Sequence, residues 1–363
     1  MAANGNLRAA KTVKNDEFYT QLNDIVREVN AYLDYDPNVF RGKTILLPCD
    51  DPEWSNFTKF FAQNFQQFGL KKLISTSFAC QSKGENGCID YCPSEFERKS
   101  KYYDPKLTKT HGKIFTLDSD SNGNGVIDIE DLQWKYLNGD GDFRSAEISK
   151  LRDEADIIIT NPPFSLLREF VAWIMEANKK FLIIGNQNAI TYKEIFPLIK
   201  DNKMWIGAMP MGFDILFHVP NSFANDMIKN EKQGSKYRIV DNRIMARSTG
   251  CWFTNLDHGR RHQPLKLMTM ADNIKFSKHS EIRENGYQKY DNYDAIEVPY
   301  TDAIPSDYDG IMGVPVSFLD KYCPEQFEIL GLDDHRVTWR GRGPDLNGKT
   351  LFFTKTTSKP SSS

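Results

Sequence analysis

Residues 155–164 read Ala-Asp-Ile-Ile-Ile-Thr-Asn-Pro-Pro-Phe, an apolar run that stops at a polar amide and two prolines. The three isoleucines favour a strand, and their unbroken apolar character indicates a strand buried on both faces. Two adjacent prolines cannot continue a sheet, because neither has a backbone N–H to donate. Residues 166–178 then show the apolar spacing of an amphipathic helix, so the stretch predicts a strand–turn–helix unit.

The same alternation of strand and helix patterns recurs through the first 210 residues. Apolar runs predict further buried strands at 44–47, 71–78 and 180–185. Helical spacing predicts further helices at 15–33, 57–68 and 192–200. Buried strands that alternate with amphipathic helices indicate an α/β fold, a largely parallel sheet with helices on both faces.

The composition excludes several classes of protein. No apolar run reaches the roughly 18–20 residues that a membrane helix needs, and the polar segment after Met1 does not resemble a signal peptide. The six cysteines are too sparse for a disulfide framework in a chain of 363 residues. We therefore expect a cytoplasmic protein that does not interact with a membrane.

Positive charge is concentrated near the C-terminus, although the formal net charge is −3. Residues 229–266 contain nine Lys and Arg against three acids, and residues 336–359 contain six against one. Such stretches suit binding to a polyanion, while ordinary solvated surface charge is an equally good interpretation.

Two of the expected strand ends carry polar groups, and ligands of open parallel sheets bind beyond the carboxyl ends of strands. The first is the segment 49–57, where Asp50 and Asp51 precede Ser55. It predicts either a ligand loop or simply a well-capped helix. The glycine motifs of dinucleotide-binding and P-loop proteins are absent, which argues against hydride transfer and ATP hydrolysis.

The second strand end is the Asn-Pro-Pro-Phe segment at 161–164. The Asn161 amide oxygen and a neighbouring backbone carbonyl can accept the hydrogens of a planar amine, while Phe164 can stack on its ring. A rigid turn is the alternative interpretation. An Asn-Pro-Pro-aromatic sequence directly after a buried strand is specific enough to favour the amine site.

These motifs resemble the EcoRI-type adenine-specific DNA methyltransferase family, and the resemblance runs from about residue 15 to about residue 350. The order of the segments is similar to the γ arrangement of such enzymes. The matching segments are 16–21, 49–57, 139–145, 155–170, 180–199, 251–257, 289–294 and 310–327.

The resemblance implies a Rossmann-like methyltransferase sheet with a C-terminal target-recognition region. It implies transfer of a methyl group from S-adenosylmethionine to adenine N6 of a base flipped out of double-stranded DNA. A companion restriction endonuclease acting on the same site is a further expected partner. The expected division is a flexible N-terminus at 1–14, a catalytic domain at 15–210, a recognition region at 211–350 and a tail at 351–363.

The resemblance also assigns roles to residues. The implied catalytic residues are Asn161, Pro162, Pro163 and Phe164. The implied cofactor-binding residues are Phe18, Tyr19, Thr20, Asp50, Asp51, Pro52, Asn56, Phe57, Asp142 and Phe143. The usual glycines of the cofactor loop are absent, and the strand at 71–78 lacks the acid that usually binds the ribose, which leaves Asp50 and Asp51 as candidates.

Other residues are candidates on their chemistry. Basic side chains suited to DNA phosphates or guanine edges are Arg243, Arg247, Arg260 and Arg261. An insertion at 118–138 contains a loop that resembles an EF-hand and predicts a calcium site, with an Asn/Gly-rich hairpin as the alternative. Its candidate ligands are Asp120, Asn122, Asn124, Asp128 and Asp131. Methyl transfer itself is expected to require no metal.

Two other functions remain open from the residues. One is an amino methyltransferase that acts on an RNA base or a protein glutamine. The other is a sequence-specific DNA-binding protein without catalytic activity. The resemblance of residues 250–327 to the DNA methyltransferase family argues against the first, and the intact Asn-Pro-Pro-Phe segment at 161–164 argues against the second.

Overall fold

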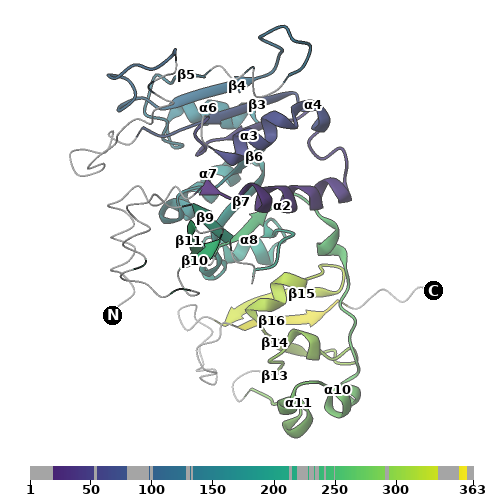
Figure 1. Cartoon of the computed structure of the whole chain (residues 1–363). Coiled ribbons are helices and arrows are strands. Elements are labelled where there is room, and N and C mark those ends of the chain that lie inside the picture. Colours follow the sequence, from purple (N-terminus) through teal and green to yellow (C-terminus); the bar gives the residue numbers. More distant parts are fainter. Residues whose placement is uncertain are drawn as a thin grey trace. The chain divides into compact units, whose positions relative to one another are not determined.

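The computed structural model shows two compact units, residues 1–187 with 212–256 (unit 1) and residues 188–211 with 257–363 (unit 2) (Figure 1). Each unit is described separately below. The structure describes residues 19–52, 55–79, 98, 101–127, 131, 134–211, 215–218, 228, 233, 237–240, 243–248, 250–290, 294–333 and 351–357.

The main sheet of unit 1 has four parallel strands at its centre. They are β3 (Lys72–Thr76), β2 (Thr44–Leu47), β6 (Ile157–Thr160) and β7 (Lys180–Asn186), in that order. Antiparallel strands extend both sides: β4 (Lys113–Leu117) and β5 (Trp134–Tyr136) beyond β3, and β12 (Gly250–Thr254) beyond β7. The sheet is thus mixed, and the expected parallel arrangement holds for its centre.

Helices cover both faces of this sheet, as the sequence predicts. The connections through α3 (Asn56–Gln63) and α7 (Leu167–Glu176) lead in opposite directions from the β2–β6 pair, and right-handed crossovers then lie on opposite faces. Helix α2 (Leu22–Tyr35) packs beside α3. Helix α6 (Ala146–Glu154) joins α7, where Trp173 Nε1 donates to Ser149 Oγ at 3.1 Å.

The Phe-rich segment forms two short helices instead of the single expected one. Helix α3 ends before Asn64, and α4 covers Phe65–Phe68. The Asn64 amide donates to the Phe60 carbonyl at 2.8 Å, which occupies an acceptor at the helix end. Gly69 ends α4 with a φ of +64°, a conformation that glycine adopts without strain.

Two other helices are shorter than the apolar spacing of their sequences predicts. The first expected helix begins at Leu22, because Tyr19–Thr20 instead form strand β1, which pairs with β9 (Ile215–His218). The expected helix at 192–200 is reduced to α8 (Phe196–Lys200), preceded by a 3₁₀ turn, η4 (Gln187–Thr191). Long-range strand pairing overrides local helical spacing at the first of these sites.

Unit 1 contains a second sheet, in which all pairs of strands are antiparallel. Its order is β1, β9, β11 (Arg243–Ser248) and β10 (Tyr237–Val240). Residues 212–256 were expected to belong to the recognition region, and in the structure they group with unit 1. The compact units therefore do not follow the expected boundary near residue 210.

Unit 2 is built on a four-stranded sheet. Its order is β13 (Ala295–Glu297), β14 (Ile311–Pro315), β16 (Leu351–Thr356) and β15 (Phe327–Asp333). The other elements of unit 2 are β8 (Trp205–Ile206), η5 (Gly259–His262), α10 (Met270–Phe276), α11 (Ser280–Asn285), η6 (Thr301–Ala303) and η7 (Val316–Lys321). Residues 351–356, expected to lie in a tail, form a central strand. No helix among the described residues is long and apolar enough to cross a membrane.

Candidate active site

The site lies where the strand order of the main sheet reverses direction. Strand β2 pairs in parallel with both β3 and β6, so the chain leaves β2 on one side and returns on the other. In open α/β sheets, ligands bind at such a switch point, beyond the carboxyl ends of the strands. The carboxyl ends of β2 and β6 are the two polar strand ends that the sequence singles out.

The loop after β2 leads directly into the N-terminus of α3. Ser55 is the N-cap, and its Oγ accepts from the Phe57 amide at 3.0 Å and the Thr58 amide at 3.4 Å. Phe57 is 1% exposed, and its ring meets Trp252 of β12 edge-on at 5.9 Å. The capped-helix interpretation is confirmed. The described part of the loop also includes Pro52, which is buried.

Asp50 is a buried junction between the two strand ends. Its carboxylate accepts from Ser55 Oγ at 2.6 Å and from Thr160 Oγ1 at 2.5 Å. Ser75 Oγ of β3 donates to the Asp50 backbone carbonyl at 2.6 Å. Since Thr160 directly precedes Asn161, Asp50 connects the Asn161–Phe164 turn to the loop after β2.

Asp51, the other ribose candidate, is more accessible. Its side chain is 23% exposed and lies 3.4 Å from Lys113 Nζ. Lys113 begins β4, and the antiparallel course of β4 brings this residue to the carboxyl edge of β3. The ammonium group also lies 5.0 Å from the centre of the Trp134 ring, a cation–π contact. Sequence reasoning missed Lys113, because a lysine at the start of a strand carries no distinguishing local signal.

Strand β1 brings Thr20 beside the loop that follows β2. Asn56 Nδ2 donates to the Thr20 carbonyl at 2.7 Å. The Thr20 hydroxyl is buried and has no hydrogen-bond partner among the described residues. A buried hydroxyl without a partner is consistent with a binding site in which a polar ligand supplies the missing hydrogen bond. Phe18 lies outside the described residues, and Tyr19 is described only by its backbone pairing.

The segment 139–143 packs closely against the end of β3. Gly141 has a φ of +81°, and a Cβ there would lie 2.2 Å from the Ser77 carbonyl oxygen, so only glycine allows this approach. The Asp142 carboxylate accepts two hydrogen bonds from the Arg144 guanidinium. Arg144 Nε donates to Oδ1 at 2.9 Å, and NH2 donates to Oδ2 at 2.6 Å. This hydrogen bonding raises the pKa of Arg144 above its ordinary value. Phe143 is buried against Phe170, at a ring separation of 5.0 Å.

The Asn-Pro-Pro-Phe turn follows β6. Asn161 is 9% exposed and Pro162 is also buried, whereas Pro163 and Phe164 are partly exposed. Phe164 begins the 3₁₀ turn η3 (Phe164–Leu166), where the Leu166 amide donates to the Pro163 carbonyl at 2.9 Å. The turn therefore combines a buried amide with an aromatic ring that can still contact a ligand.

The candidate DNA-binding arginines differ in their surroundings. In unit 2, Arg260 NH1 donates to the Ala208 carbonyl at 2.6 Å, and Arg261 NH2 donates to Asn202 Oδ1 at 2.9 Å. Both side chains thus hold segments of their own unit together, a role that the sequence prediction missed. Arg243 and Arg247 lie on β11 and are described only by their backbone.

The calcium prediction finds no support in the described residues. Asp120 accepts from the amides of Gly123 and Gly125, and Asp131 accepts from those of Ser121 and Asn122. Asn122 and Asn124 likewise accept from backbone amides within the loop. Asp128 lies outside the described residues, which contain no group of three or more His, Cys, Asp or Glu that could hold a metal. The loop is preceded by β4 and not by an entering helix.

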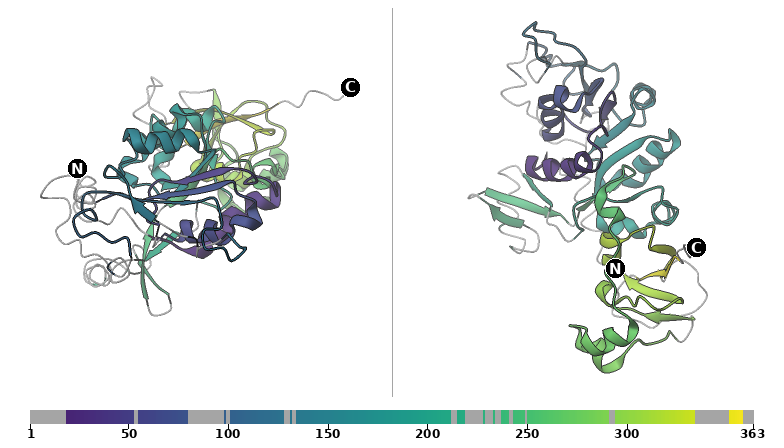
Figure 2. Two further views of the ribbon diagram at one scale, coloured as in Figure 1. Left: turned by 90° about the horizontal axis from the view of Figure 1, so that it is seen from above. Right: turned by 90° about the vertical axis from the view of Figure 1, so that its right-hand side faces the viewer.

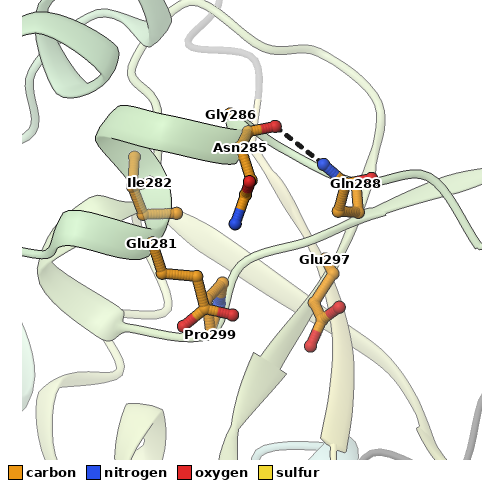
Figure 3. A pocket seen from close by; sticks show the side chains of 7 residues that line it. All are labelled: Glu281, Ile282, Asn285, Gly286, Gln288, Glu297 and Pro299. Carbon is orange, nitrogen blue, oxygen red and sulfur yellow. Dashed lines mark hydrogen bonds between the residues drawn. The ribbon is translucent and has the colours of Figure 1, made fainter.

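Unit 2 contains a separate small hollow beside α11 (Figure 3), with a volume of about 180 Å³. Two carboxylates, Glu281 and Glu297, lie on its wall, and Gln288 Nε2 donates to the Asn285 carbonyl at 2.7 Å. An acidic lining does not suit a phosphate backbone. None of the predicted site residues lines this hollow.

The parallel centre of the main sheet and the Asn-Pro-Pro-Phe turn at its switch point define the class of S-adenosylmethionine-dependent amino methyltransferases. Comparison with known proteins identifies the family within this class. The chain belongs to the family described as adenine-specific methyltransferase EcoRI, whose model matches residues 6–359. It is therefore an adenine-specific DNA methyltransferase.

The chain is similar to three curated methyltransferases. It is 40% identical to the type II methyltransferase M.EcoRI of Escherichia coli, over 97% of this chain and 95% of that protein. It is 34% identical to M.MpnI of Mycoplasma pneumoniae, over 88% and 83% of the two chains. The identity to M.MgeORF184P of Mycoplasma genitalium is also 34%, over 88% and 84%. No solved structure matches.

Proposed function

We propose that this enzyme transfers the methyl group of S-adenosylmethionine to the N6 atom of an adenine that it flips out of duplex DNA. The main support is the Asn161–Phe164 turn, which follows β6 directly and is connected to the cofactor loop through the Thr160–Asp50 hydrogen bond. Direct transfer of a methyl group between two bound substrates requires that the site of the methyl acceptor lies beside the cofactor loop.

S-adenosylmethionine, when bound, supplies an electrophilic methyl group on a sulfonium. Thr20 and Asn56 would hold its methionine end, and the buried Thr20 hydroxyl is consistent with this role. Asp51 is the better ribose candidate, because both carboxylate oxygens of Asp50 already accept hydrogen bonds within the protein. Asp142 would receive the adenine amine of the cofactor.

The residues of the turn would make the target amine reactive. The lone pair of an adenine amine is delocalised into the ring, so the amine is a weak nucleophile. Hydrogen bonds from N6 to the Asn161 side-chain oxygen and the Pro162 carbonyl favour a more tetrahedral nitrogen and stabilise its developing positive charge. Phe164 would stack on the flipped base.

The first test compares Asn161→Ala and Phe164→Ala. Loss of one transition-state contact should lower methyl transfer by Asn161→Ala at least ~10²-fold, while cofactor and DNA binding persist. Phe164→Ala should chiefly weaken binding of the flipped base, because base stacking is worth about 1–3 kcal/mol. Transfer of a tritiated methyl group measures the first effect, and 2-aminopurine fluorescence at the target position measures the second.

Asn38→Ala is a matched control for this test. Asn38 is exposed in the connection that enters β2, at the opposite edge of the sheet from the site. Its replacement should leave transfer unchanged. Near-normal turnover by Asn161→Ala would contradict the proposed mechanism.

The wider role that we propose is protection of host DNA beside a companion restriction endonuclease. The support is the name of the similar M.EcoRI, a type II methyltransferase. Methylation sequencing of plasmid DNA from cells that express the enzyme would identify its recognition site, and digestion with a nuclease specific for that site would show protection. Calcium is not part of the proposal, because the Asp120 and Asp131 carboxylates already bind the amides of their own loop.

A further inference from the structure

A turn of unit 1 that leads into β4 has a high density of positive charge. Residues 98–113 contain six Lys and Arg against one acid, Asp104, and are a third basic stretch besides the two near the C-terminus. Within residues 101–111, which we call the basic turn, Lys101, Lys106 and Lys109 are exposed. In the right-hand view of Figure 2 this part of the chain is blue and lies at the end of unit 1 that β4 and β5 form.

The one acid of the basic turn is occupied by the backbone of the turn itself. The Asp104 carboxylate accepts from the Lys106 amide at 2.7 Å and from the Leu107 amide at 3.4 Å. Among the described residues, no carboxylate forms an ion pair with Lys101, Lys106 or Lys109. The charge of these three lysines is therefore available to an anionic partner.

Aromatic side chains hold the basic turn against β5. The Tyr102 ring centre lies 5.7 Å from that of Trp134, and the Lys101 ammonium lies 4.8 Å from the centre of the Tyr102 ring. The Asp104 amide donates to the Tyr136 hydroxyl at 3.2 Å. The lysines thus extend from a backbone whose position is defined, which lowers the entropy lost when a partner binds.

The basic turn lies at the same edge of the main sheet as the Asn161–Phe164 turn. Strand β4 runs antiparallel to β3, and its first residue, Lys113, accepts at its carbonyl from the Ser77 amide at 3.0 Å, just beyond the end of β3. The order β4, β3, β2, β6 places three strand spacings, about 14 Å, between β4 and β6. The basic turn is therefore about 14 Å from the strand that ends at Asn161.

This separation suits a duplex whose target adenine occupies the Asn161–Phe164 turn. The phosphates of one DNA strand follow one another at about 3.4 Å along the helix axis, so 14 Å corresponds to about four base pairs. A duplex that extends from the site along the strand order of the sheet therefore brings its phosphates to the basic turn. Lysine on an edge strand also prevents pairing between sheets, but this role explains only Lys135 of β5 and not the lysines of the turn.

We propose that Lys101, Lys106 and Lys109 bind phosphates of the duplex on one side of the target adenine, about four base pairs away. The proposal rests on the proposed function and adds a DNA contact of unit 1 that lies outside the expected recognition region. Phosphate contacts position a duplex without reading its sequence. The basic turn should therefore strengthen binding to every DNA sequence.

The test is the triple variant K101Q/K106Q/K109Q, which removes three charges at exposed positions and should leave the melting temperature unchanged. The probe is duplex DNA that contains the recognition site identified by methylation sequencing. Binding of this DNA is measured over a range of salt concentrations, and methyl transfer is measured on the same duplex.

The matched control is K43Q/K71Q/K150Q, which makes the same three changes elsewhere on unit 1. These lysines are also exposed. Lys43 and Lys71 directly precede β2 and β3, at the opposite edge of the sheet, and Lys150 lies on α6. This control should bind DNA as the wild type does.

The triple variant should bind the duplex at least ~10-fold more weakly at 0.1 M salt, and the slope of log K against log salt should become shallower by about 2–3. The loss should be similar on a duplex without the recognition site. The kcat at saturating DNA and the Kd for S-adenosylmethionine should not change, because these lysines contact neither the reacting atoms nor the cofactor.

Neutral methylphosphonates in the DNA locate the contact. One duplex carries them about three to five base pairs to the 5′ side of the target adenine, and a second carries them equally far to the 3′ side. One of the two duplexes should bind the wild type and the control variant more weakly. The same substitution should cause no further loss in the triple variant, because the contact is already missing.

Each other outcome would overturn the proposal. Equal affinity and equal salt slopes for the triple and control variants would assign the basic turn to the solvated surface. An equal loss from methylphosphonates in the wild type and the triple variant would place the phosphate contact elsewhere on the enzyme. A lower melting temperature together with a lower kcat would give the lysines a structural role. Wild-type enzyme that methylates no DNA adenine would instead refute the proposed function.

Discussion

Asp50 joins residues that are far apart in the sequence, because its carboxylate accepts from Ser55, five positions away, and from Thr160, 110 positions away. The carboxylate is buried, so both hydrogen bonds form in a low-dielectric environment, where they are strong. One side chain thus holds the loop after β2 and the Asn161–Phe164 turn in register. We regard Asp50 as a positioning residue.

Thr160→Val tests this positioning role, because it removes only the hydrogen bond that connects β6 to Asp50. We expect kcat to fall about tenfold through a small displacement of Asn161. The KM for S-adenosylmethionine should not change, because Ser55 still holds the cofactor loop. Steady-state kinetics separate the two parameters, and Thr160→Ser should restore kcat because it keeps the hydroxyl. A lower melting temperature with normal kcat would reduce Thr160 to a purely structural residue.

At the scale of elements, the 3₁₀ turn η5 carries two arginines whose sequence context suggested DNA contacts. Arg261 is 10% exposed, and its guanidinium lies 4.0 Å from the Trp205 ring centre and 3.6 Å from an Asp257 carboxylate oxygen. These contacts join η5 to β8 within unit 2. Arg261 thus contributes to the packing of its own unit, and its predicted contact with DNA phosphates stays a prediction.

Arg261→Ala should therefore destabilise unit 2, by about 1–3 kcal/mol, through lost packing and hydrogen bonding. Thermal unfolding measures the loss, and the matched control is Lys193→Ala, at a position that is 81% exposed. An unchanged melting temperature together with a weaker salt dependence of DNA binding would instead support the predicted phosphate contact of Arg261.

At the scale of the whole molecule, we expect two histidines to make the stability of unit 2 depend on pH. Burial lowers the pKa of His258 to about 4, although the carbonyl of Ile206 accepts a hydrogen bond from its ring. Burial also opposes the charged form of His262, yet hydrogen bonds to Asp257 and Glu325 raise its pKa above the ordinary 6.5.

The stability of unit 2 should therefore be greatest near the ordinary histidine pKa of 6.5. The contribution of neutral His258 is complete above this pH and is lost as the pH falls toward about 4. The contribution of charged His262 is complete below pH 6.5 and is lost as the pH rises through its raised pKa.

Thermal unfolding of the whole chain, measured as a function of pH, checks whether stability falls on both the acid and the alkaline side. His258→Gln should flatten only the acid side of the profile, and His262→Gln only the alkaline side. An acid limb that persists unchanged in His258→Gln would show that other groups cause it.

Much of this protein could be predicted from local sequence. The strands at 44–47 and 157–160 and the cap at Ser55 follow from apolar runs and short-range hydrogen bonding, which neighbouring residues alone determine. The family follows from motifs that span most of the chain. The Asn161–Phe164 turn could be assigned to the carboxyl edge of a sheet because it directly follows its own strand.

The tertiary structure alone decided which distant residues meet. The Asp50–Thr160 contact, the approach of Lys113 to Asp51 and the central place of β16 depend on pairings across many residues, for which a single sequence contains no local signal. The same holds for the packing of Arg261 against Trp205, which no local pattern around Arg261 indicates. A local pattern specifies the conformation of a segment, whereas burial and partners depend on what the rest of the chain brings to it.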